Sequence, residues 1–178
     1  VLEAKKDLYQ ANPEHAIQAL FDRVMVISDS AHALGATYKG QPAGTWADFT
    51  SFSFHAVKNF TTAEGGSVTW KARPGLDDDE LYRLFQVFSL HGQTKDALAK
   101  TQLGAWEYDI VIPGFKCNMT DIMASIGLVQ LQRYPGLLAR RKELVAQYDQ
   151  GFAGTPIKPL PHQGADYESS RHLYITHI

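Results

Sequence analysis

The sequence predicts an α/β fold in which a mostly parallel sheet is flanked by helices. A helical apolar pattern in residues 12–21 is followed by the continuous apolar run Val24–Ile27, which is typical of a strand buried on both faces. Two further strand-like segments, Phe49–Phe54 and Gly66–Trp70, are followed by segments with the apolar period of helices. This alternation of helix and buried strand is typical of βαβ units.

Each element of the first half has a local signal. Asn12 and Pro13 predict a helix start, because asparagine is a good N-cap and proline fits the first turn. Glycine and proline in Thr37–Ala47 predict a loop or a pair of weak strands. In Phe49–Phe54 the phenylalanines alternate with serines, which gives a strand with one apolar and one polar face.

The second half is predicted to be mainly helical. Acidic residues at 77–80 open a helix whose buried stripe is Leu81, Leu84, Phe85 and Phe88. Residues 91–101 read as loop and Tyr108–Ile112 as a strand. Thr120 or Asp121 caps a helix with Ile122, Ile126 and Val129 on one face, and Pro135 starts another, which ends at Gly151 and Gly154. Residues 172–178 read as a strand just beginning, so we expect this sequence to be the middle part of a longer chain.

Composition excludes several classes of protein. The 178 residues are 44% hydrophobic, enough for a core, and their net charge of −2 gives no support for nucleic acid as a partner. No apolar run approaches the roughly 20 residues of a membrane span, and residues 1–7 do not resemble a signal peptide. A single cysteine excludes an internal disulfide and a multi-cysteine metal site. We therefore expect a cytoplasmic enzyme or binding domain, with no metal, nucleic acid or membrane.

The first candidate site residues follow the predicted strand Val24–Ile27. Asp29 comes after its carboxyl end, the edge at which ligands bind in open α/β sheets, and His32 lies three residues further on. The alternative reading of Asp29 is a helix cap. The alternative reading of His32 is a hydrogen-bonded structural histidine.

The second pair of candidates belongs to the strand Phe49–Phe54. Ser53 lies on its polar face, and Lys58 follows its end. Taken alone, a lysine at this place is usually a solvated loop residue. However, two adjacent strand ends would bring an aspartate, a histidine, a serine and a lysine to one edge of a sheet.

One cofactor needs this set of side chains. Pyridoxal 5′-phosphate (PLP) requires a lysine amine for its Schiff base and an acid that keeps its pyridine nitrogen protonated. Hydroxyl and amide donors bind its phosphate. The residues therefore favour a PLP site.

Three segments resemble the sugar aminotransferases of the DegT/DnrJ/StrS family. They are SDSAHALGATYKG, ADFTSFSFHAVKNFTTAEGG and GFKCNMTDIMASIGLVQL, which begin at Ser28, Ala47 and Gly114. The resemblance runs from about Ala16 to the end of the chain. It implies a PLP-dependent enzyme of fold type I, whose large domain is a three-layer sandwich. It also implies that residues 1–132 belong to the large PLP-binding domain, and residues 133–178 to a linking helix and the start of a small domain.

The resemblance also implies roles for individual residues. Lys58 would carry the Schiff base and then move the proton, while Asp29 would pair with the pyridine nitrogen. His32 would touch the ring or its 3′-oxygen, and Ser53 would hold the phosphate. In the family segment whose asparagine reaches the cofactor phosphate of the other subunit, this sequence has Lys116 and Asn118, which implies a homodimer with its active site at the interface.

By resemblance, the expected reaction is amino transfer from glutamate to a nucleotide-linked keto-sugar in polysaccharide biosynthesis. We expect the chain alone to be inactive, because other parts of the family's active site are absent from it. Three alternatives stay open at this point. They are a sugar dehydratase relative, in which histidine replaces the lysine, a PLP-binding regulatory protein, and a structural domain without a cofactor.

Overall fold

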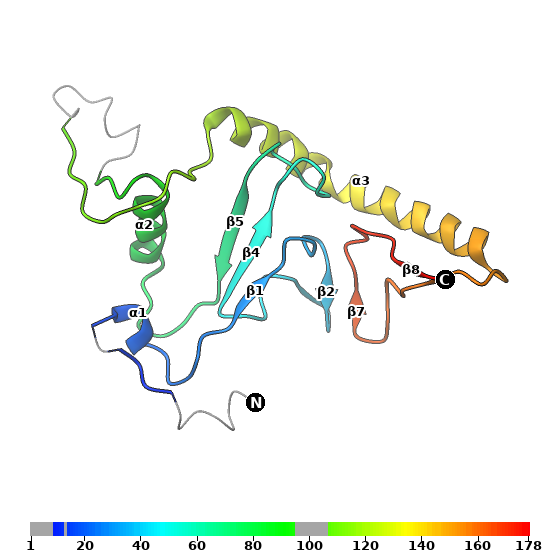
Figure 1. Ribbon diagram of the computed structural model, residues 1–178, viewed down its shortest axis with the longest axis horizontal. Helices are drawn as coiled ribbons and strands as arrows, with labels where there is room; N and C mark the ends of the chain where they lie inside the picture. Colours follow the sequence, from blue (N-terminus) through cyan, green and yellow to red (C-terminus); the bar gives the residue numbers. More distant parts are fainter. Residues whose placement is uncertain (1–8, 13, 95–106) are drawn as a thin grey trace. The chain divides into compact units, whose positions relative to one another are not determined.

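The structure is a computed structural model that describes residues 9–12, 14–94 and 107–178 (Figure 1). Its chain forms two compact units. One comprises the described parts of residues 1–24 and 72–119, and the other comprises residues 25–71 and 120–178. The candidate residues Asp29, His32, Ser53 and Lys58 all belong to the second unit.

The second unit contains a three-stranded sheet with the order β1-β4-β5 (Figure 1). β1 (Ile27–Asp29) is parallel to β4 (Phe49–Ser53), and β4 is antiparallel to β5 (Gly66–Trp70). Burial alternates along β4, with Thr50 and Phe52 buried and their neighbours half-buried. The two predicted strands at 49–54 and 66–70 are thus confirmed, and the predicted polar and apolar faces of the first are correct.

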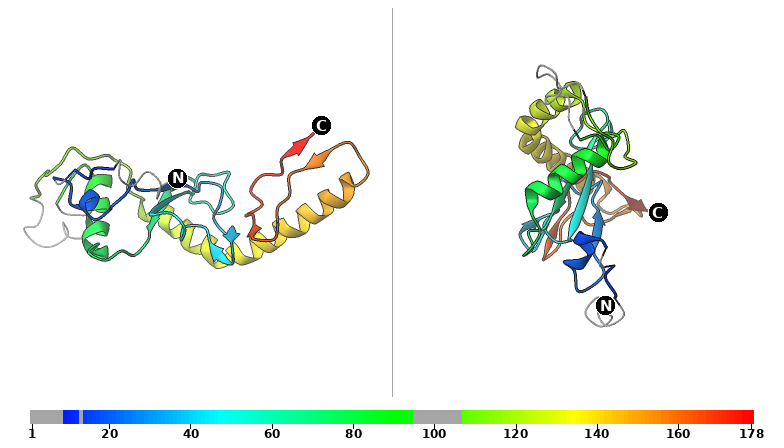
Figure 2. Two further views of the ribbon diagram at one scale, coloured as in Figure 1. Left: turned by 90° about the horizontal axis from the view of Figure 1, so that it is seen from below. Right: turned by 90° about the vertical axis from the view of Figure 1, so that its left-hand side faces the viewer.

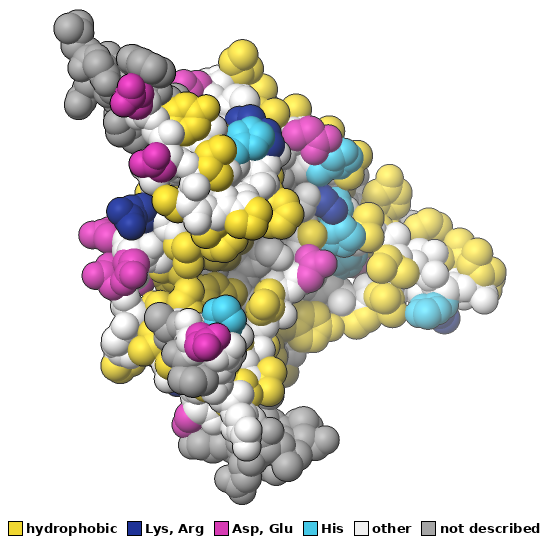
Figure 3. All heavy atoms as spheres, turned by 60° about the vertical axis from the view of Figure 1, so that its left-hand side comes forward, with side chains coloured by type: hydrophobic (Ala, Val, Ile, Leu, Met, Phe, Trp, Pro, Cys, Tyr) yellow, Lys and Arg dark blue, Asp and Glu magenta, His cyan; other side chains and the backbone are white. Residues whose placement is uncertain are grey.

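The prediction for the first strand was wrong in two respects. The strand begins at Ile27 and not at Val24, and Val24 and Ile27 are 56% and 70% exposed. Among the described residues β1 pairs with β4 alone, so its other edge has no neighbour in this part of the chain. Figure 3 shows many other hydrophobic side chains at the surface. The apolar run Val24–Ile27 therefore marks a strand whose side chains are not buried by the described residues.

Short strands make up two smaller sheets of the second unit. The segment Thr37–Ala47 contains the predicted pair of weak strands, β2 (Thr37–Tyr38) and β3 (Gln41–Pro42), and β7 (Tyr167–Glu168) extends this sheet. β6 (Lys158–Pro159) pairs with β8 (Thr176–His177). The strand predicted at 172–178 is therefore present, but only two residues long.

A single long helix, α3 (Asp121–Phe152), replaces the two predicted helices. Its N-cap is Thr120, as predicted, and its hydroxyl accepts the N–H of Met123 at 3.3 Å. Pro135 lies inside the helix and does not start a new one. An interior proline costs a helix about 3 kcal/mol, so tertiary contacts must hold the two halves together. The predicted domain boundary at 132/133 falls within this helix and stays a prediction.

The face of α3 that carries Ile122, Ile126 and Val129 is not its buried side. Ile122, Ile126 and Val129 are exposed, whereas the buried residues are Gly127, Tyr134 and Val145. The segments after α3 run back along its C-terminal half, as the orange and red segments in the left view of Figure 2 show. A 3.6-residue period thus located the helix without identifying the side that the described residues cover.

The first unit contains α1 (Ala16–Ala19) and α2 (Asp78–Ser89). The helix predicted from Asn12 is shorter, because the Asn12 side chain accepts the N–H of Glu14 in a turn, and His15 becomes the N-cap. Asp77 caps α2 as predicted by accepting two backbone N–H groups. Of the predicted stripe of α2, only Leu81 is buried, and Leu84, Phe85 and Phe88 are exposed.

Two further predictions fall on the first unit. Tyr108–Ile112 forms no strand, and its one β-type pair is the isolated bridge between Ile110 and Gln93. The predicted loop at 91–101 lies outside the described residues from position 95 onward. Within the described parts of the chain, no helix is both long and apolar enough to cross a membrane.

Candidate active site

The parallel pairing of β1 and β4 brings Asp29 and Ser53 to the same edge of the sheet. Asp29 is opposite Ser51 in the register, and the N–H of Ser30 continues the ladder with a bond to the Ser51 carbonyl at 2.9 Å. Both strands end within two residues of this pair. The sheet edge expected from the sequence is therefore present, with an acid on one strand and a hydroxyl on the next.

The loop after β1 presents the Asp29 carboxylate to solvent. Asp29 is exposed, and its Oδ1 accepts the N–H of Ala31 at 3.1 Å. Residues 30–36 form turns, so the alternative role of Asp29 as a helix cap is excluded. In the described part of the chain, Oδ2 of Asp29 has no hydrogen-bond or ion-pair partner. One carboxylate oxygen is thus bound by the loop and the other is available to a ligand.

α3 fixes the loop that carries His32. The hydroxyl of Tyr134 donates to the carbonyl of Leu34 at 2.5 Å, and burial raises the pKa of Tyr134 to about 12. Gly35 has φ +86°, and a Cβ at this position would meet a Leu138 methyl at 2.7 Å. The positive φ favours glycine here, and the Leu138 side chain would have to move for any larger residue. The loop is therefore held by the helix that follows much later in the sequence.

Lys58 lies in the turn that follows β4. Its N–H donates to the His55 carbonyl at 2.9 Å, and the chain returns to β4 through a bond from Thr62 N–H to the Phe54 carbonyl at 2.9 Å. Lys58 is half-buried, and no described residue forms a hydrogen bond or ion pair with its ammonium. The side chain of Lys58 is thus partly covered, and its ammonium is available to a ligand.

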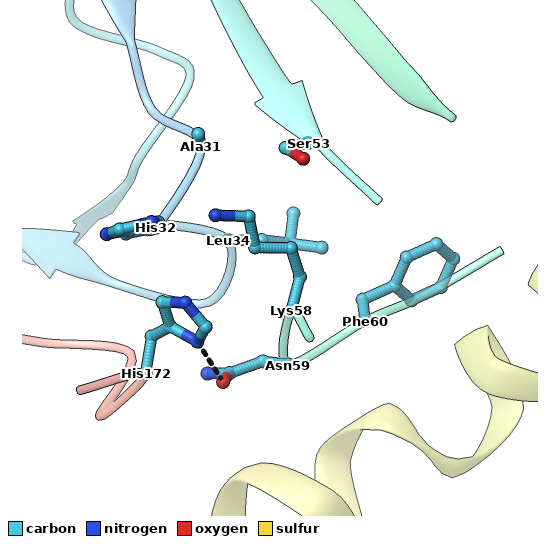
Figure 4. A pocket seen from close by; sticks show the side chains of 8 residues that line it. All are labelled: Ala31, His32, Leu34, Ser53, Lys58, Asn59, Phe60 and His172. Atoms are coloured by element: carbon cyan, nitrogen blue, oxygen red, sulfur yellow. Dashed lines mark hydrogen bonds between the residues drawn. The ribbon is translucent and has the colours of Figure 1, made fainter. Parts of the chain in front are cut away.

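A small pocket brings three of the predicted residues together. His32, Ser53 and Lys58 line it with Ala31, Leu34, Asn59, Phe60 and His172 (Figure 4). The end of the Lys58 side chain points toward the loop of Ala31 and His32 in this view. Its volume of about 10 Å³ is room for about one water molecule.

A larger groove of about 330 Å³ contains Asp29. Asp29 and Ser30 line it on the side of β1, and residues 160–162 and 169–173 line it on the side of the chain after α3. His32 and His172 belong to both the groove and the small pocket. The structure therefore places Asp29 in a different cavity from Ser53 and Lys58, and the two cavities adjoin at a pair of histidines.

His172 is a site residue that the sequence did not identify. Its Nδ1 lies 3.2 Å from Oδ1 of Asn59, while the amide nitrogen of Asn59 donates to the Ser170 carbonyl at 2.6 Å (Figure 4). The carbonyl of Ser170 fixes the orientation of the Asn59 amide. Nδ1 of His172 must therefore carry the proton, and Nε2 carries a lone pair.

The environment of His172 keeps its ring neutral. Burial, followed by the nearby His32, Lys58 and Arg141, lowers the pKa of His172 from its ordinary value. The rings of His172 and His32 are 4.4 Å apart between centroids, at an interplanar angle of 60°. His172 thus packs against His32 as an oriented, uncharged ring. No spacing signal in the sequence links it to Asn59, which lies 113 positions earlier.

Removing the Asn59 amide should destabilise this arrangement. Asn59→Leu leaves the Ser170 carbonyl and the His172 Nδ1–H without partners, and each unpaired group costs about 1–3 kcal/mol. We expect the free energy of unfolding of the complete gene product to fall by about 2–4 kcal/mol in urea denaturation. Gln147→Leu, on the exposed side of α3, is the matched control and should change it by about 0.5 kcal/mol or less. An equal effect of both variants would contradict the network.

Lys116 and Asn118 lie in the first unit. The Lys116 ammonium donates a hydrogen bond to the Asn118 side chain, and both residues precede α3. Cys117 between them is exposed. The predicted role of Lys116 and Asn118 at the site of another subunit stays a prediction.

Known proteins are similar to this chain in sequence and in structure. A sequence profile of the DegT/DnrJ/EryC1/StrS aminotransferase family matches residues 15–178. The spore coat polysaccharide biosynthesis protein SpsC of Bacillus subtilis is 39% identical over 158 residues, which are 87% of this chain and 39% of SpsC. The uncharacterized protein MJ1066 of Methanocaldococcus jannaschii is 42% identical over 150 residues, which are 84% of this chain and 37% of MJ1066.

Solved structures of aminotransferases are also similar to this chain. Spr1654 from Streptococcus pneumoniae, assigned as a sugar aminotransferase, has a TM-score of 0.89 and 67% identity in its PMP form, covering 98% of this chain and 43% of that one. Its PLP form has a TM-score of 0.88 and 63% identity over 98% of this chain and 42% of that one. PseC of Helicobacter pylori, an aminotransferase involved in the biosynthesis of pseudoaminic acid, has a TM-score of 0.69 and 35% identity over 85% and 37%. This chain spans about two fifths of the length of these relatives.

The strand order, the acid that ends β1, the lysine that follows β4, and these matches define an α/β domain of the fold-type I PLP-dependent enzymes. The chain belongs to the DegT/DnrJ/EryC1/StrS aminotransferase family.

Proposed function

We propose that this chain supplies the lysine side of the active site of a PLP-dependent sugar aminotransferase. The reaction would transfer an amino group from glutamate to a nucleotide-linked keto-sugar. The observation that carries the proposal is the half-buried residue Lys58, whose ammonium has no partner among the described residues and which shares a pocket with His32 and Ser53.

The side chains present suit PLP by their chemistry. Lys58 offers an amine for covalent attachment, and the unpaired Oδ2 of Asp29 offers a carboxylate for a protonated ring nitrogen. The Ser53 hydroxyl accepts the N–H of His55 at 3.3 Å, so its own hydrogen is available to a phosphate oxygen. When bound, the cofactor would supply an electron sink for the bonds at the substrate Cα.

Each of these residues would then have a separate role in the reaction. Lys58 Nζ would hold the cofactor and, after release, carry the proton between the two reacting carbons. Asp29 would keep the ring nitrogen protonated through a charge-assisted hydrogen bond. His32, fixed between its loop and the ring of His172, would set the position of the cofactor ring. The loop itself is held by Tyr134 and Gly35, which supports a preorganised site.

The structure favours this reaction over that of a sugar dehydratase relative. Lys58 and not His55 lines the pocket, and His55 pairs with Glu64 at 3.5 Å on the exposed side of the turn. The position at which the dehydratases have histidine is therefore occupied by an amine. A homodimer, with Lys116 and Asn118 at the site of the other subunit, and a cytoplasmic location remain parts of the proposal.

Amino transfer by the complete gene product tests the function directly. We expect glutamate to be converted to 2-oxoglutarate in an amount equal to the amino sugar formed from a nucleotide-linked keto-sugar, as quantified by mass spectrometry with 15N-labelled glutamate. Loss of the sugar oxygen without incorporation of 15N would indicate a dehydratase. A protein that binds PLP without either reaction would be the regulatory alternative, and both results would refute the proposal.

A further inference from the structure

The groove that contains Asp29 has a second wall that the proposed function does not use. This wall is formed by the chain after α3 and includes His162, Ser169 and Arg171. The groove volume of about 330 Å³ falls in the range of small-molecule sites. Both His162 and Arg171 have a buried nitrogen without a hydrogen-bond partner among the described residues.

Arg171 is placed as a fixed donor. Its side chain is 8% exposed, and its backbone has φ +54°, a conformation that residues other than glycine seldom adopt. Nη1 donates to Oε1 of Glu168 at 2.9 Å and to the Ser169 carbonyl at 3.2 Å. Nε and Nη2 form no hydrogen bond with any described residue, and Nε is fully buried. One complete edge of the guanidinium, with two parallel N–H groups, is therefore unused.

His162 contributes a second unpaired nitrogen. Its Nδ1 lies 2.8 Å from the Ser169 hydroxyl, and its ring stacks on Tyr174 at 5.6 Å with an angle of 25°. Burial, followed by the charge of Arg171, lowers the pKa of His162, so the ring is neutral at pH 7. Nε2 is buried without a partner. An unpaired polar atom in such a position is costly unless a ligand or a water molecule satisfies it.

Charged groups of both signs lie around Arg171. Glu168 is shared by Arg171 and Lys142, at 2.9 Å and 3.2 Å. Arg141 lies close by, since its Nη1 donates to the Arg171 carbonyl at 3.4 Å. Two cations thus share the Glu168 carboxylate, and a second carboxylate, Asp149, lies close enough to act on His162. Asp29 lines the opposite wall of the groove and has its own role in the proposed function.

We propose that His162 and Arg171 form an oxyanion subsite that binds the charged end of a substrate. The unused edge of Arg171 has the two parallel donors that match a carboxylate or a phosphate. In the reaction proposed above, on which this inference rests, such oxyanions come from two sources. They are the carboxylates of the amino donor and the phosphates of the nucleotide sugar.

Calorimetric titration of the complete gene product with two unreactive probes tests the subsite. The probes are glutarate, a dicarboxylate without an amine, and inorganic pyrophosphate. We expect Arg171→Gln to weaken one of them at least tenfold and to leave the other unchanged. A loss for glutarate assigns the subsite to the donor, and a loss for pyrophosphate assigns it to the nucleotide. Arg140→Gln, an exposed arginine paired with Glu143 on α3, is the matched control.

Arg171→Lys is a second variant that distinguishes loss of the subsite from loss of the fold. Lysine keeps the charge beside Glu168 but lacks the paired donors. It should weaken the same probe, and circular dichroism should show an intact fold. Unchanged binding of both probes in a folded Arg171 variant would overturn the subsite, as would their failure to bind the wild-type protein. Absorbance of the cofactor is read separately. Arg171-dependent binding in a protein that takes up no PLP would refute the proposed function and leave the subsite standing.

Discussion

Replacing Lys58 with alanine is expected to abolish the absorbance band of the lysine-bound cofactor in the complete gene product. The amine of Lys58, which lines the small pocket, is the group that the proposed function uses for covalent attachment, and alanine removes it without adding volume. Borohydride should fix the cofactor to the wild-type protein and not to Lys58→Ala, as seen in intact mass. Amino transfer should fall by at least about 10³-fold. Lys58 acts with the other site residues as one catalytic unit, and removing one member of such a unit removes most of the rate enhancement of the whole unit.

Two matched variants separate attachment from charge. Lys58→Arg keeps a cation in the pocket but cannot form the bond, so it should also lack the band while retaining more cofactor through its phosphate. Lys71→Ala removes an exposed lysine outside the pocket and should behave as wild type. A band that survives in Lys58→Ala, with the borohydride adduct on another lysine, would show that Lys58 has been misassigned.

The sheet edge could be predicted from sequence because its signals are local. A strand end, the parity of side chains along a strand and the parallel pairing of neighbouring strands are enough to place Asp29 and Ser53 at the same edge of the sheet. The turn that carries Lys58 follows the second strand directly, so its place in the fold is fixed by only a few residues. The structure shows β1 parallel to β4, which is the one condition that this reasoning needed.

The remaining features depend on contacts between distant residues. No local rule indicates that the helix continues through Pro135, because its two halves are held by the contacts of Tyr134 with Leu34 and by the burial of Val145. His172 reaches the pocket only because the chain returns along α3. The prediction of which apolar residues are buried failed for a related reason. Apolar periodicity marks the surfaces that need a partner, and the described residues leave those at Ile122 and Ile27 exposed.

Changing Asp29 to asparagine is expected to give the second large effect. The amide keeps the size of the side chain, and its oxygen can still accept the N–H of Ala31, so the loop should be preserved. It cannot hold a proton on the ring nitrogen of the cofactor, since it carries no negative charge. We expect cofactor binding to persist, but abstraction of the α-proton of glutamate to slow by about 10²–10³-fold, the usual cost of removing one preorganised electrostatic group.

Stopped-flow absorbance with glutamate and [2-2H]glutamate measures this step in isolation. The deuterium isotope effect on the half-reaction should increase in Asp29→Asn, because proton abstraction becomes the slowest step. Asp166→Asn is the matched control, since this aspartate is exposed and lies outside both cavities. If Asp29→Asn reacts at the wild-type rate with an unchanged isotope effect, the carboxylate does not act on the ring. Asp29 would then be only the residue that orders the loop before His32.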